Sequence, residues 1–461
     1  MPPRFFRIGL LITCAVILTA AIAKLSLAAK SNSAPAASGS PDIGTLLVFP
    51  FDNDSRVASL DWLGEGLAEV TTERLQDRNL SLLSRQDRLA ALEKIGLPDS
   101  ARFSHATIVK IASEADADAV VFGRFISDGK TLTLEARVLR LSPPWLSAPL
   151  TQSGTLENLF RLHARLTWQI LCALAQKNCL QPGANMDESS FAAPPPSLRS
   201  DALQNFVRGT IALDDDSRLR TLREAARLEP AWDRPQFELG QLYFMRRNCD
   251  AALPWYSHVP PSRPDGAEAA FNTGICHLLQ NDATRAESVF SGLQERSRGT
   301  DAKDRLPDMP EVRNNLGVAH LRAGKLVEAA AEFERAAALD EEEPDYWFNV
   351  GIAKLVAKQP AAAVPPLERA LKNDPKDKDV RALLISTLES LGRSSDAAAL
   401  VSEAAASGGG AAPPAPREPI TQVRLAMKFD RTLLRPANAT PAGQSPRGIN
   451  SPKQGGDTGR K

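Results

Sequence analysis

Three asparagines offer the most specific binding chemistry in this sequence. Asn272, Asn315 and Asn349 each stand two residues before a glycine, at the same place in a repeating pattern. A side-chain amide carries both a hydrogen-bond donor and an acceptor, which suits it to holding the backbone of an extended peptide. The same amides could instead tie neighbouring helices together. Of these two interpretations, we favour a peptide-binding groove.

Apolar side chains accompany the asparagines at two fixed offsets. A phenylalanine directly precedes two of them and recurs at the equivalent place earlier in the pattern, and an isoleucine or valine follows each asparagine by three positions. In a groove these side chains would give contact area to a bound peptide, and otherwise they are plain core. The candidate groove residues of this kind are Phe237, Phe271, Phe348, Ile275, Val318 and Ile352.

Four of the five cysteines are candidates for disulfides. Proximity in the sequence favours Cys172 with Cys179 and Cys249 with Cys276. Continuous helix would hold the first pair about 10 Å apart, which is too far for a bridge, so that disulfide requires a helix that ends near Lys177. Disulfides suit an exported protein, and four unpaired buried thiols are an equal alternative.

No catalytic or metal-binding pattern is present in the sequence. The five histidines are scattered, without a second histidine at metal-ligand spacing. There is no phosphate-binding loop, dinucleotide fingerprint or glycine-flanked nucleophilic serine. The 55 Lys and Arg residues equal the 55 Asp and Glu residues, so the chain lacks the charge of a nucleic-acid binder. We therefore expect a non-enzymatic protein with no metal, no cofactor and no nucleic-acid partner.

The amino terminus has the layout of a bacterial secretory signal. Arg4 and Arg7 precede an apolar run of 16 residues, 8–23, and small residues follow. This run is shorter than the roughly 20 residues that span a bilayer. Residues 1–29 are predicted to be a cleaved signal peptide, with a retained signal anchor as the alternative, and 30–42 a linker. Either one predicts a periplasmic or otherwise extracytoplasmic protein, and the anchor would add association with the inner membrane.

Alternating strand and helix patterns predict an α/β domain at 43–182. Strands are expected at 43–51, 80–84, 119–126 and 132–141, and helices at 60–75, 86–95, 106–114 and 156–175. Asp128-Gly129, between the last two strands, is typical of a tight hairpin turn with positive φ angles.

Particular segments of this domain carry a family resemblance. LLVFPFDN, WLGEGLAEVTTERL and ADAVVFGRF, followed by SDGKTLTLEARVLRL, resemble the TolB-like amino-terminal domain. That family is related to FlgO-type and CsgG-like envelope domains, and it recurs in bacterial envelope proteins and before tetratricopeptide repeats. By analogy, the resemblance implies a role in the cell envelope.

After a linker at 183–199, the sequence of 200–406 repeats. Gly240 and Gly274 are 34 residues apart, and small and aromatic residues recur at the same interval. A 34-residue unit with a glycine in its first helix and small, aromatic, small positions in its second resembles the tetratricopeptide repeat (TPR). The resemblance implies an all-α solenoid of helix-turn-helix units, about six in number, with the first and last degenerate. Full repeats are expected to begin near Asp233, Ala267, Pro310, Pro344 and Lys378.

Two features qualify the repeat pattern. The interval between Gly274 and Gly317 is nine residues longer than a repeat, which predicts an inserted loop within 296–308. The second position of four repeats is acidic, whereas TPR domains that clamp a carboxyl-terminal carboxylate supply Lys or Arg there. We interpret these acids first as partners of the helix dipole and second as a preference for basic ligands. They are Glu268, Glu311, Asp345 and Asp379.

The carboxyl-terminal tail, 407–461, is rich in Gly, Pro and Ala and locally basic, with nine Lys or Arg against three Asp or Glu from 411 onward. This composition predicts disorder, interrupted by a short helix at 420–434. The helix could dock back on the repeats, aided by the acidic positions, or reach a separate partner or anionic surface. Docking is the favoured interpretation.

Together these patterns predict a multidomain chain, a TolB-like α/β domain followed by an all-α TPR solenoid. The function they favour is a non-enzymatic exported scaffold or adaptor that binds a protein or peptide partner in the bacterial cell envelope. The alternative is a membrane-anchored regulatory or sensor protein that activates an envelope enzyme.

Overall fold

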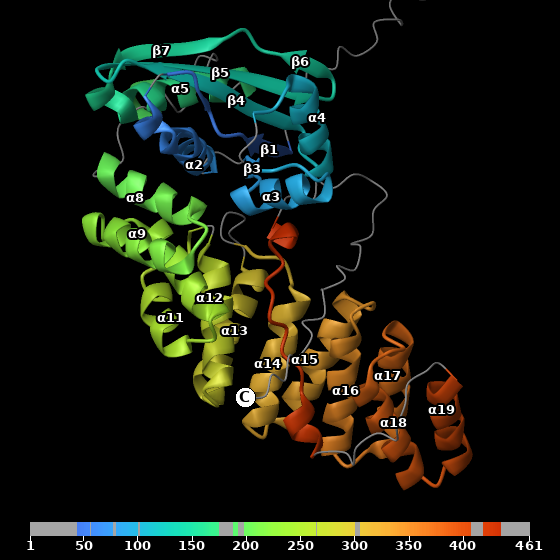
Figure 1. The fold of residues 1–461 in the computed structure, drawn as a ribbon. Helices are drawn as coiled ribbons and strands as arrows, with labels where there is room; N and C mark the ends of the chain where they lie inside the picture. Colours follow the sequence, from blue (N-terminus) through green and yellow to red (C-terminus); the bar gives the residue numbers. More distant parts are fainter. Residues whose placement is uncertain are drawn as a thin grey trace, which may run out of the picture.

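The computed structural model describes residues 44–55, 57–76, 80–99, 102–174, 188–191, 198–263, 265–299, 305–406 and 418–434. They form an α/β unit above a row of antiparallel helices, with a carboxyl-terminal segment laid along that row (Figure 1). The predicted signal segment 1–29 and linker 30–42 lie outside the described residues. No described helix combines the length and apolarity needed to cross a bilayer.

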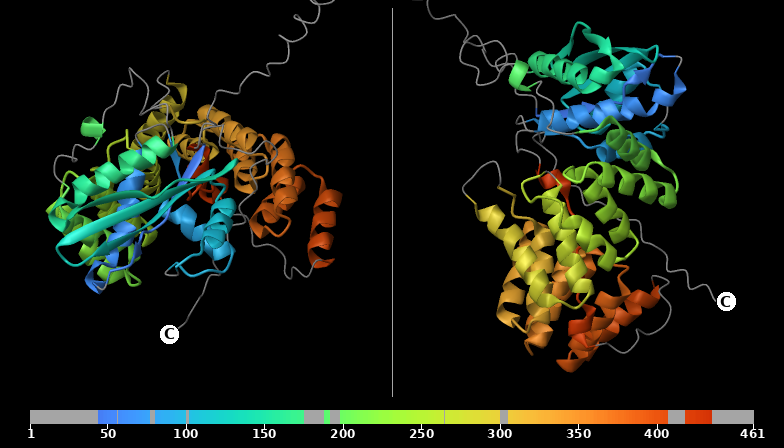
Figure 2. Two further views of the ribbon diagram at one scale, coloured as in Figure 1. Left: turned by 90° about the horizontal axis from the view of Figure 1, so that it is seen from above. Right: turned by 90° about the vertical axis from the view of Figure 1, so that its left-hand side faces the viewer.

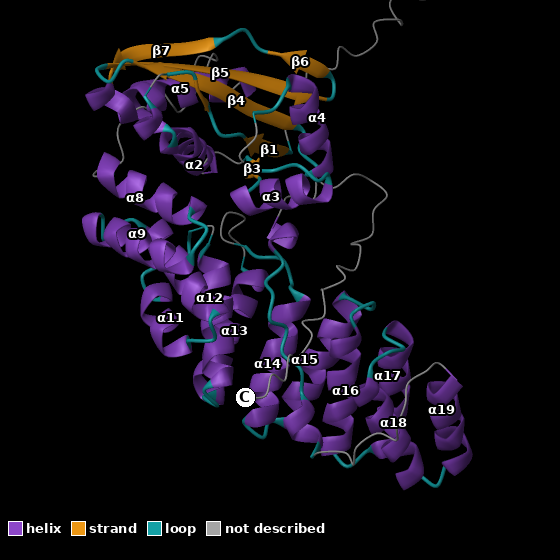
Figure 3. Ribbon diagram, viewed as in Figure 1, coloured by secondary structure: helices purple, strands orange, loops and turns teal. Residues whose placement is uncertain are grey.

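The α/β unit is built on a mixed sheet, which the described residues show as seven strands (Figure 3). The strand order is β3-β1-β4-β5-β6, with β2 beside β4 and β7 beside β5. Strand β1 runs parallel to both β3 and β4. Strand β5 runs antiparallel to each of its three neighbours, β4, β6 and β7. The strands are β1 (Thr45–Val48), β2 (Asp52–Asn53), β3 (Ser81–Leu82), β4 (Ala119–Ser127), β5 (Thr131–Leu141), β6 (Pro144–Leu146) and β7 (Leu150–Thr155).

Helices cover both faces of this sheet because β1 is apolar on both sides. Leu46 and Val48 pack in one cluster with α2 and α5, and Leu47, between them, packs in another with α3 and α4. Successive strand side chains point to opposite faces, so a continuous apolar run requires two covering layers. These helices are α2 (Trp62–Gln76), α3 (Arg85–Lys94), α4 (His105–Glu114) and α5 (Leu159–Leu174).

The expected strands and helices of this unit are present with small shifts of their ends, and three features differ. Only Gly129 of the hairpin turn has a positive φ, +91°; the Asp128 carboxylate instead accepts hydrogen bonds from the Lys130 and Thr131 backbone N–H groups. The short edge strands β2, β6 and β7 have too little apolar pattern to be recognised. The predicted linker 183–199 contains a helical turn, α7 (Glu188–Phe191), whose last residue is buried against the unit.

The helical row consists of antiparallel pairs, six of them among the described residues, from Ser200 to Ala406. Each predicted start of a full repeat lies within one residue of the first residue of α10, α12, α14, α16 or α18. The pairs are α8 (Ser200–Ile211) with α9 (Asp215–Leu228), α10 (Asp233–Met245) with α11 (Cys249–Tyr256), α12 (Gly266–Leu279) with α13 (Ala283–Arg298), α14 (Pro310–Arg322) with α15 (Leu326–Leu339), α16 (Pro344–Val356) with α17 (Pro360–Asn373), and α18 (Lys378–Ser390) with α19 (Ser394–Ala406).

The 34-residue interval follows from close contact between the two helices of a repeat. A Cβ atom placed on Gly240 or Gly274 would lie 2.5 Å from the ring of Tyr256 or Phe290 in the second helix. At Gly317 the distance to Phe333 would be 2.7 Å, and Gly351 meets Leu367 in the same way. Glycine is therefore required where the large side chain crosses the first helix.

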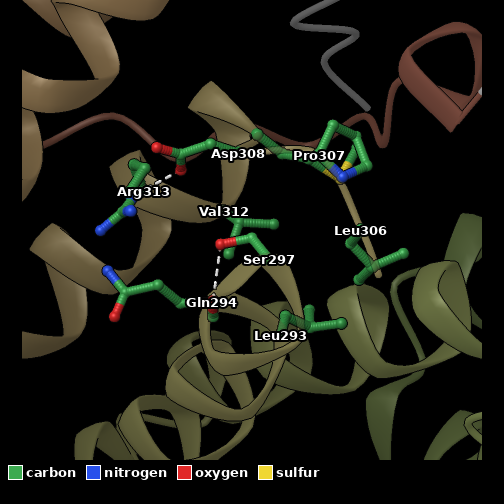
Figure 4. A pocket seen from close by; sticks show the side chains of 9 residues that line it. Leu293, Gln294, Ser297, Leu306, Pro307, Asp308, Val312 and Arg313 are labelled. Carbon is green, nitrogen blue, oxygen red and sulfur yellow. Dashed lines mark hydrogen bonds and ion pairs between the residues drawn. The ribbon is translucent and has the colours of Figure 1, made fainter. Parts of the chain in front are cut away.

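The inserted loop lies where the longer interval predicts it. The chain leaves α13 at Arg298 and returns to α14 through 305–309, where Asp308 bonds Arg313 and Arg335. A small pocket lies beside this loop, and Figure 4 shows Asp308 and Arg313 facing each other at its edge. Among the described residues that line this pocket, Asp308 is the one acid and it is already paired, so they offer no second acid for acid-base chemistry.

The α/β unit rests on the first repeats through helix α2. Val70 of α2 packs with Phe206 and Val207 of α8. Two ion pairs flank this contact: Arg234 to Glu69 at 2.9 Å and Arg263 to Glu73 at 3.0 Å. The two parts of the chain are therefore held together by a small apolar centre and an ionic edge.

We expect Gly317→Ala to destabilise the chain by about 1 to 3 kcal/mol, because the new methyl group must displace Phe333. Gly292→Ala is the matched control, since an added Cβ at this exposed position of α13 would meet nothing within 4 Å. It should be neutral or stabilising by about 0.5 to 1 kcal/mol. Urea unfolding measures both, and equal stability of the two variants would contradict the close-contact explanation.

Candidate peptide-binding groove

Residues 418–434 lie along the first helices of the repeats. The segment begins with a 3-10 turn, η3 (Pro419–Gln422), beside α16 and ends with another, η4 (Arg431–Leu434), close to the α/β unit (Figures 1 and 2). No regular structure connects the two turns over 423–430. Docking of the tail was expected, but the predicted helix at 420–434 is wrong.

Side-chain amides hold the backbone of this segment. Asn349 accepts from the Arg424 backbone N–H at 2.9 Å and donates to the carbonyl of the same residue at 2.7 Å. Asn315 makes the same two bonds with Ala426, at 2.9 and 2.8 Å. The bonded residues alternate, as they do in a strand. These amides supply the backbone partners that a helix would otherwise supply, which explains the extended conformation.

The remaining asparagines of this region have different roles. Asn314, which the sequence pattern did not single out, donates to the Arg424 carbonyl at 3.0 Å and accepts from Asn349 at 2.7 Å. Asn272 instead donates to Gln241 and to the Tyr256 hydroxyl, which ties its repeat to the preceding one. The asparagines therefore bond either the extended segment of the same chain or a neighbouring helix, and Asn349 does both.

Three phenylalanines each contact one side chain of the segment. The guanidinium carbon of Arg424 lies 4.1 Å from the ring centroid of Phe348, and that of Arg431 lies 5.3 Å from that of Phe237. Between them, the Phe429 ring is 5.4 Å from Phe271. Cation-π contact and ring packing thus alternate along the groove. The three candidate residues at the other offset, Ile275, Val318 and Ile352, are fully buried in the apolar core of the array.

Carboxylates complete the site of Arg424. Its guanidinium is 2.7 Å from Asp345, 2.6 Å from Asp377 and 3.9 Å from Asp379. Asp377 is the N-cap residue of α18 and was missed, because a capping aspartate is usually explained by the helix alone.

The site of Arg431 joins the segment to the α/β unit. Arg431 bonds Glu268 and, at 2.9 Å, Asp265. Asp265 is also 2.9 Å from Arg234, which reaches Glu69 of α2. Burial alone would raise the pKa of Asp265, but the two arginines hold it below its ordinary value. A single buried carboxylate is therefore shared between the tail and the contact with the α/β unit.

Glu311 is the buried acid of the groove floor. Its carboxylate accepts from the Asp430 backbone N–H at 2.8 Å, and burial raises its pKa to about 7. All four acids at the second position of the repeats thus face the segment, by direct hydrogen bond or within 3.9 Å of Arg424. All four also stand in the first turn of their helices, so the structure is consistent with the helix-dipole interpretation and adds contact with the segment to it.

A disulfide joins the second and third repeats. Cys249 in α11 and Cys276 in α12 are bonded, with their Cα atoms 5.2 Å apart. Cys179, the predicted partner of Cys172, lies outside the described residues. Within the described ranges, no group of three His, Cys, Asp or Glu residues is placed to hold a metal ion.

The fold and this groove define a class of protein, a helical-repeat scaffold for protein interaction. Residues 257–301, 298–344 and 349–416 match the family model described as tetratricopeptide repeat, so this part of the chain is a TPR array. The TolB-like resemblance of the α/β unit rests on its sequence segments alone.

Several solved structures are similar to part of the chain. A MamA structure is 17% identical with a TM-score of 0.32, over 37% of this chain and 94% of that one. YrrB, titled a TPR protein with an unusual peptide-binding site, is 15% identical with a TM-score of 0.32, over 40% and 90%. PilF of Pseudomonas aeruginosa is 18% identical with a TM-score of 0.34, over 46% and 90%. No curated protein matches the sequence.

Replacing Asn315 and Asn349 by Ala should free the segment, since each loses two backbone hydrogen bonds worth about 1 kcal/mol apiece. We expect amide hydrogen exchange over 423–427 to accelerate at least 10-fold, with helical circular dichroism unchanged. Asn272→Ala is the control, because Asn272 bonds Gln241 and Tyr256. Equal protection in all three chains would show that the amides do not hold the segment.

Glu311→Gln should stabilise the chain at pH 8 and have little effect below pH 4.5. Burial raises the pKa of Glu311 from 4.5 in the unfolded chain to about 7 in the folded chain. This carboxyl group therefore does not lower the free energy of unfolding while it is protonated in both the folded and the unfolded chain, and it lowers that free energy most above pH 7, where it is ionised in both. The gain is on the order of 3 kcal/mol at most. Thermal unfolding at several pH values measures it, with Glu328→Gln, at an exposed site, as the control. A gain that does not vary with pH would indicate packing instead of ionisation.

Proposed function

We propose that this chain is a non-enzymatic adaptor whose TPR array holds an extended segment of a protein partner in the bacterial cell envelope. The observation that carries the proposal is the two-way hydrogen bonding of Asn315 and Asn349 with the backbone of a segment lying in the groove. Such bonds recognise extended conformation regardless of side chain, as in other modes of peptide recognition.

Side-chain selectivity would come from the surfaces beside the amides. Phe348 with Asp345 and Asp377, and Phe237 with Asp265 and Glu268, each form an aromatic face edged by acids. Both surfaces suit the flat guanidinium group of arginine. A partner segment with positive charge and an aromatic residue therefore fits the groove better than an acidic one.

The cellular setting is proposed from the sequence. The signal-like residues 1–29 support export to the periplasm, and the TolB-like resemblance supports a second contact in the envelope through the α/β unit. If residues 8–23 are retained, the same groove would belong to the alternative, a membrane-anchored regulator of an envelope enzyme. The mass of the chain recovered from envelope fractions separates a cleaved signal from a retained anchor.

Capture of a partner from envelope extracts by the full chain tests the adaptor proposal. We expect the Asn315→Ala/Asn349→Ala chain to retain the partner at least 10-fold less well, because the backbone bonds to its extended segment are lost. Asn272→Ala should capture it as the native chain does. Undiminished capture by a folded double variant would rule out the groove as the binding site.

A further inference from the structure

We infer that residues 418–434 are a resident ligand of the groove, and that a partner displaces them with a segment of the same chemistry. That chemistry is two arginines seven positions apart, with an aromatic residue two positions before the second, as in Arg424, Phe429 and Arg431. The inference rests on the proposed function and adds to it the chemical class of the partner segment.

The contacts are those of a ligand in a binding site. Each arginine lies over one phenylalanine and between two or more carboxylates, while both side chains keep solvent contact, at 20% and 31% exposure. Phe429 is the buried anchor between them, at 6% exposure. One aromatic anchor flanked by charge-assisted bonds is a common arrangement for binding a short peptide.

The contact that joins the two helices of a repeat does not involve the segment. The helices of each repeat are joined by contacts such as Gly317 with Phe333, which lie within the array. When Arg431 leaves, Asp265 keeps its ion pair with Arg234, so this buried carboxylate is not left without a partner. Release of the segment uncovers the apolar surface that Phe429 covers, and it leaves the contacts between paired helices in place beside an acidic, aromatic groove.

The chain also carries its segment on a short tether. Residues 407–417, between α19 and the segment, include three Gly and three Pro. Covalent linkage through a connection of this length gives an effective concentration on the order of millimolar. A segment in the same chain would then compete strongly with a partner. The apparent affinity of the partner would be weakened by about the ratio of the segment's effective concentration to the segment's own dissociation constant.

The test measures binding of a fluorescent synthetic peptide of residues 418–434 to the full chain by anisotropy. Native chain should bind it weakly, and the Arg424→Glu/Arg431→Glu chain at least 10-fold more tightly, because its own segment is repelled by the groove acids. The same peptide with both arginines replaced by glutamate should bind neither chain. Equal binding of the native peptide by both chains would overturn the inference.

Lys428→Glu is the matched control, since Lys428 is the exposed basic residue of the same segment. This chain should bind the peptide as weakly as the native one, and binding as tight as in the double variant would refute the role of the two arginines. Arg424→Ala/Arg431→Ala repeats the test if the glutamate variant fails to fold.

Two further outcomes separate this inference from a segment bound to a second copy of the chain and from the adaptor proposal. Sedimentation of the native chain should show a monomer, and a dimer that only the arginine variant abolishes would place the segment in a second copy, against the inference. If the arginine variant leaves peptide binding unchanged while the asparagine variant still loses the captured partner, the adaptor proposal stands and the resident ligand does not.

Discussion

The close approach of two helices at a glycine is the constraint on which the array depends. Tyr256, Phe290 and Phe333 can cross the first helix of their repeats only because no Cβ stands in the way. This contact sets the orientation of each pair, and stacking the pairs then brings the first helices side by side. Asn315 and Asn349 reach the backbone of the same segment because this stacking places consecutive repeats next to each other.

The groove combines two kinds of recognition with different demands. Amide bonds to Arg424 and Ala426 require an extended backbone and accept any side chain, whereas the phenylalanines and carboxylates select the side chains. Both kinds are needed for a specific peptide site, since main-chain bonds give affinity and side-chain contacts give selectivity. Asp345, Asp377, Asp265 and Glu268 bind arginine side chains, whereas Glu311 accepts from a backbone N–H.

Charge connects the groove to the rest of the molecule. Asp265 lies between Arg431 of the segment and Arg234, which pairs with Glu69 of α2 in the α/β unit. The occupied groove and the contact between the two parts of the chain therefore share one buried carboxylate. Because buried charges are costly without partners, the occupant at this end of the groove affects the electrostatics of that contact.

Repeat spacing in the sequence determined the helix pairs and the inner position of Asn315, Asn349 and the three phenylalanines. A 34-residue period places equivalent residues at equivalent positions of successive helix pairs. The sequence also showed which residues are acidic, but not that Asp345 and Asp377 meet Arg424, since these partners are distant in the chain and only stacking unites them. The tail conformation was likewise decided by tertiary structure. Val423, Met427 and Leu434 are compatible with a helix, yet the amides of α14 and α16 bond the backbone and stabilise the extended form that local sequence does not favour.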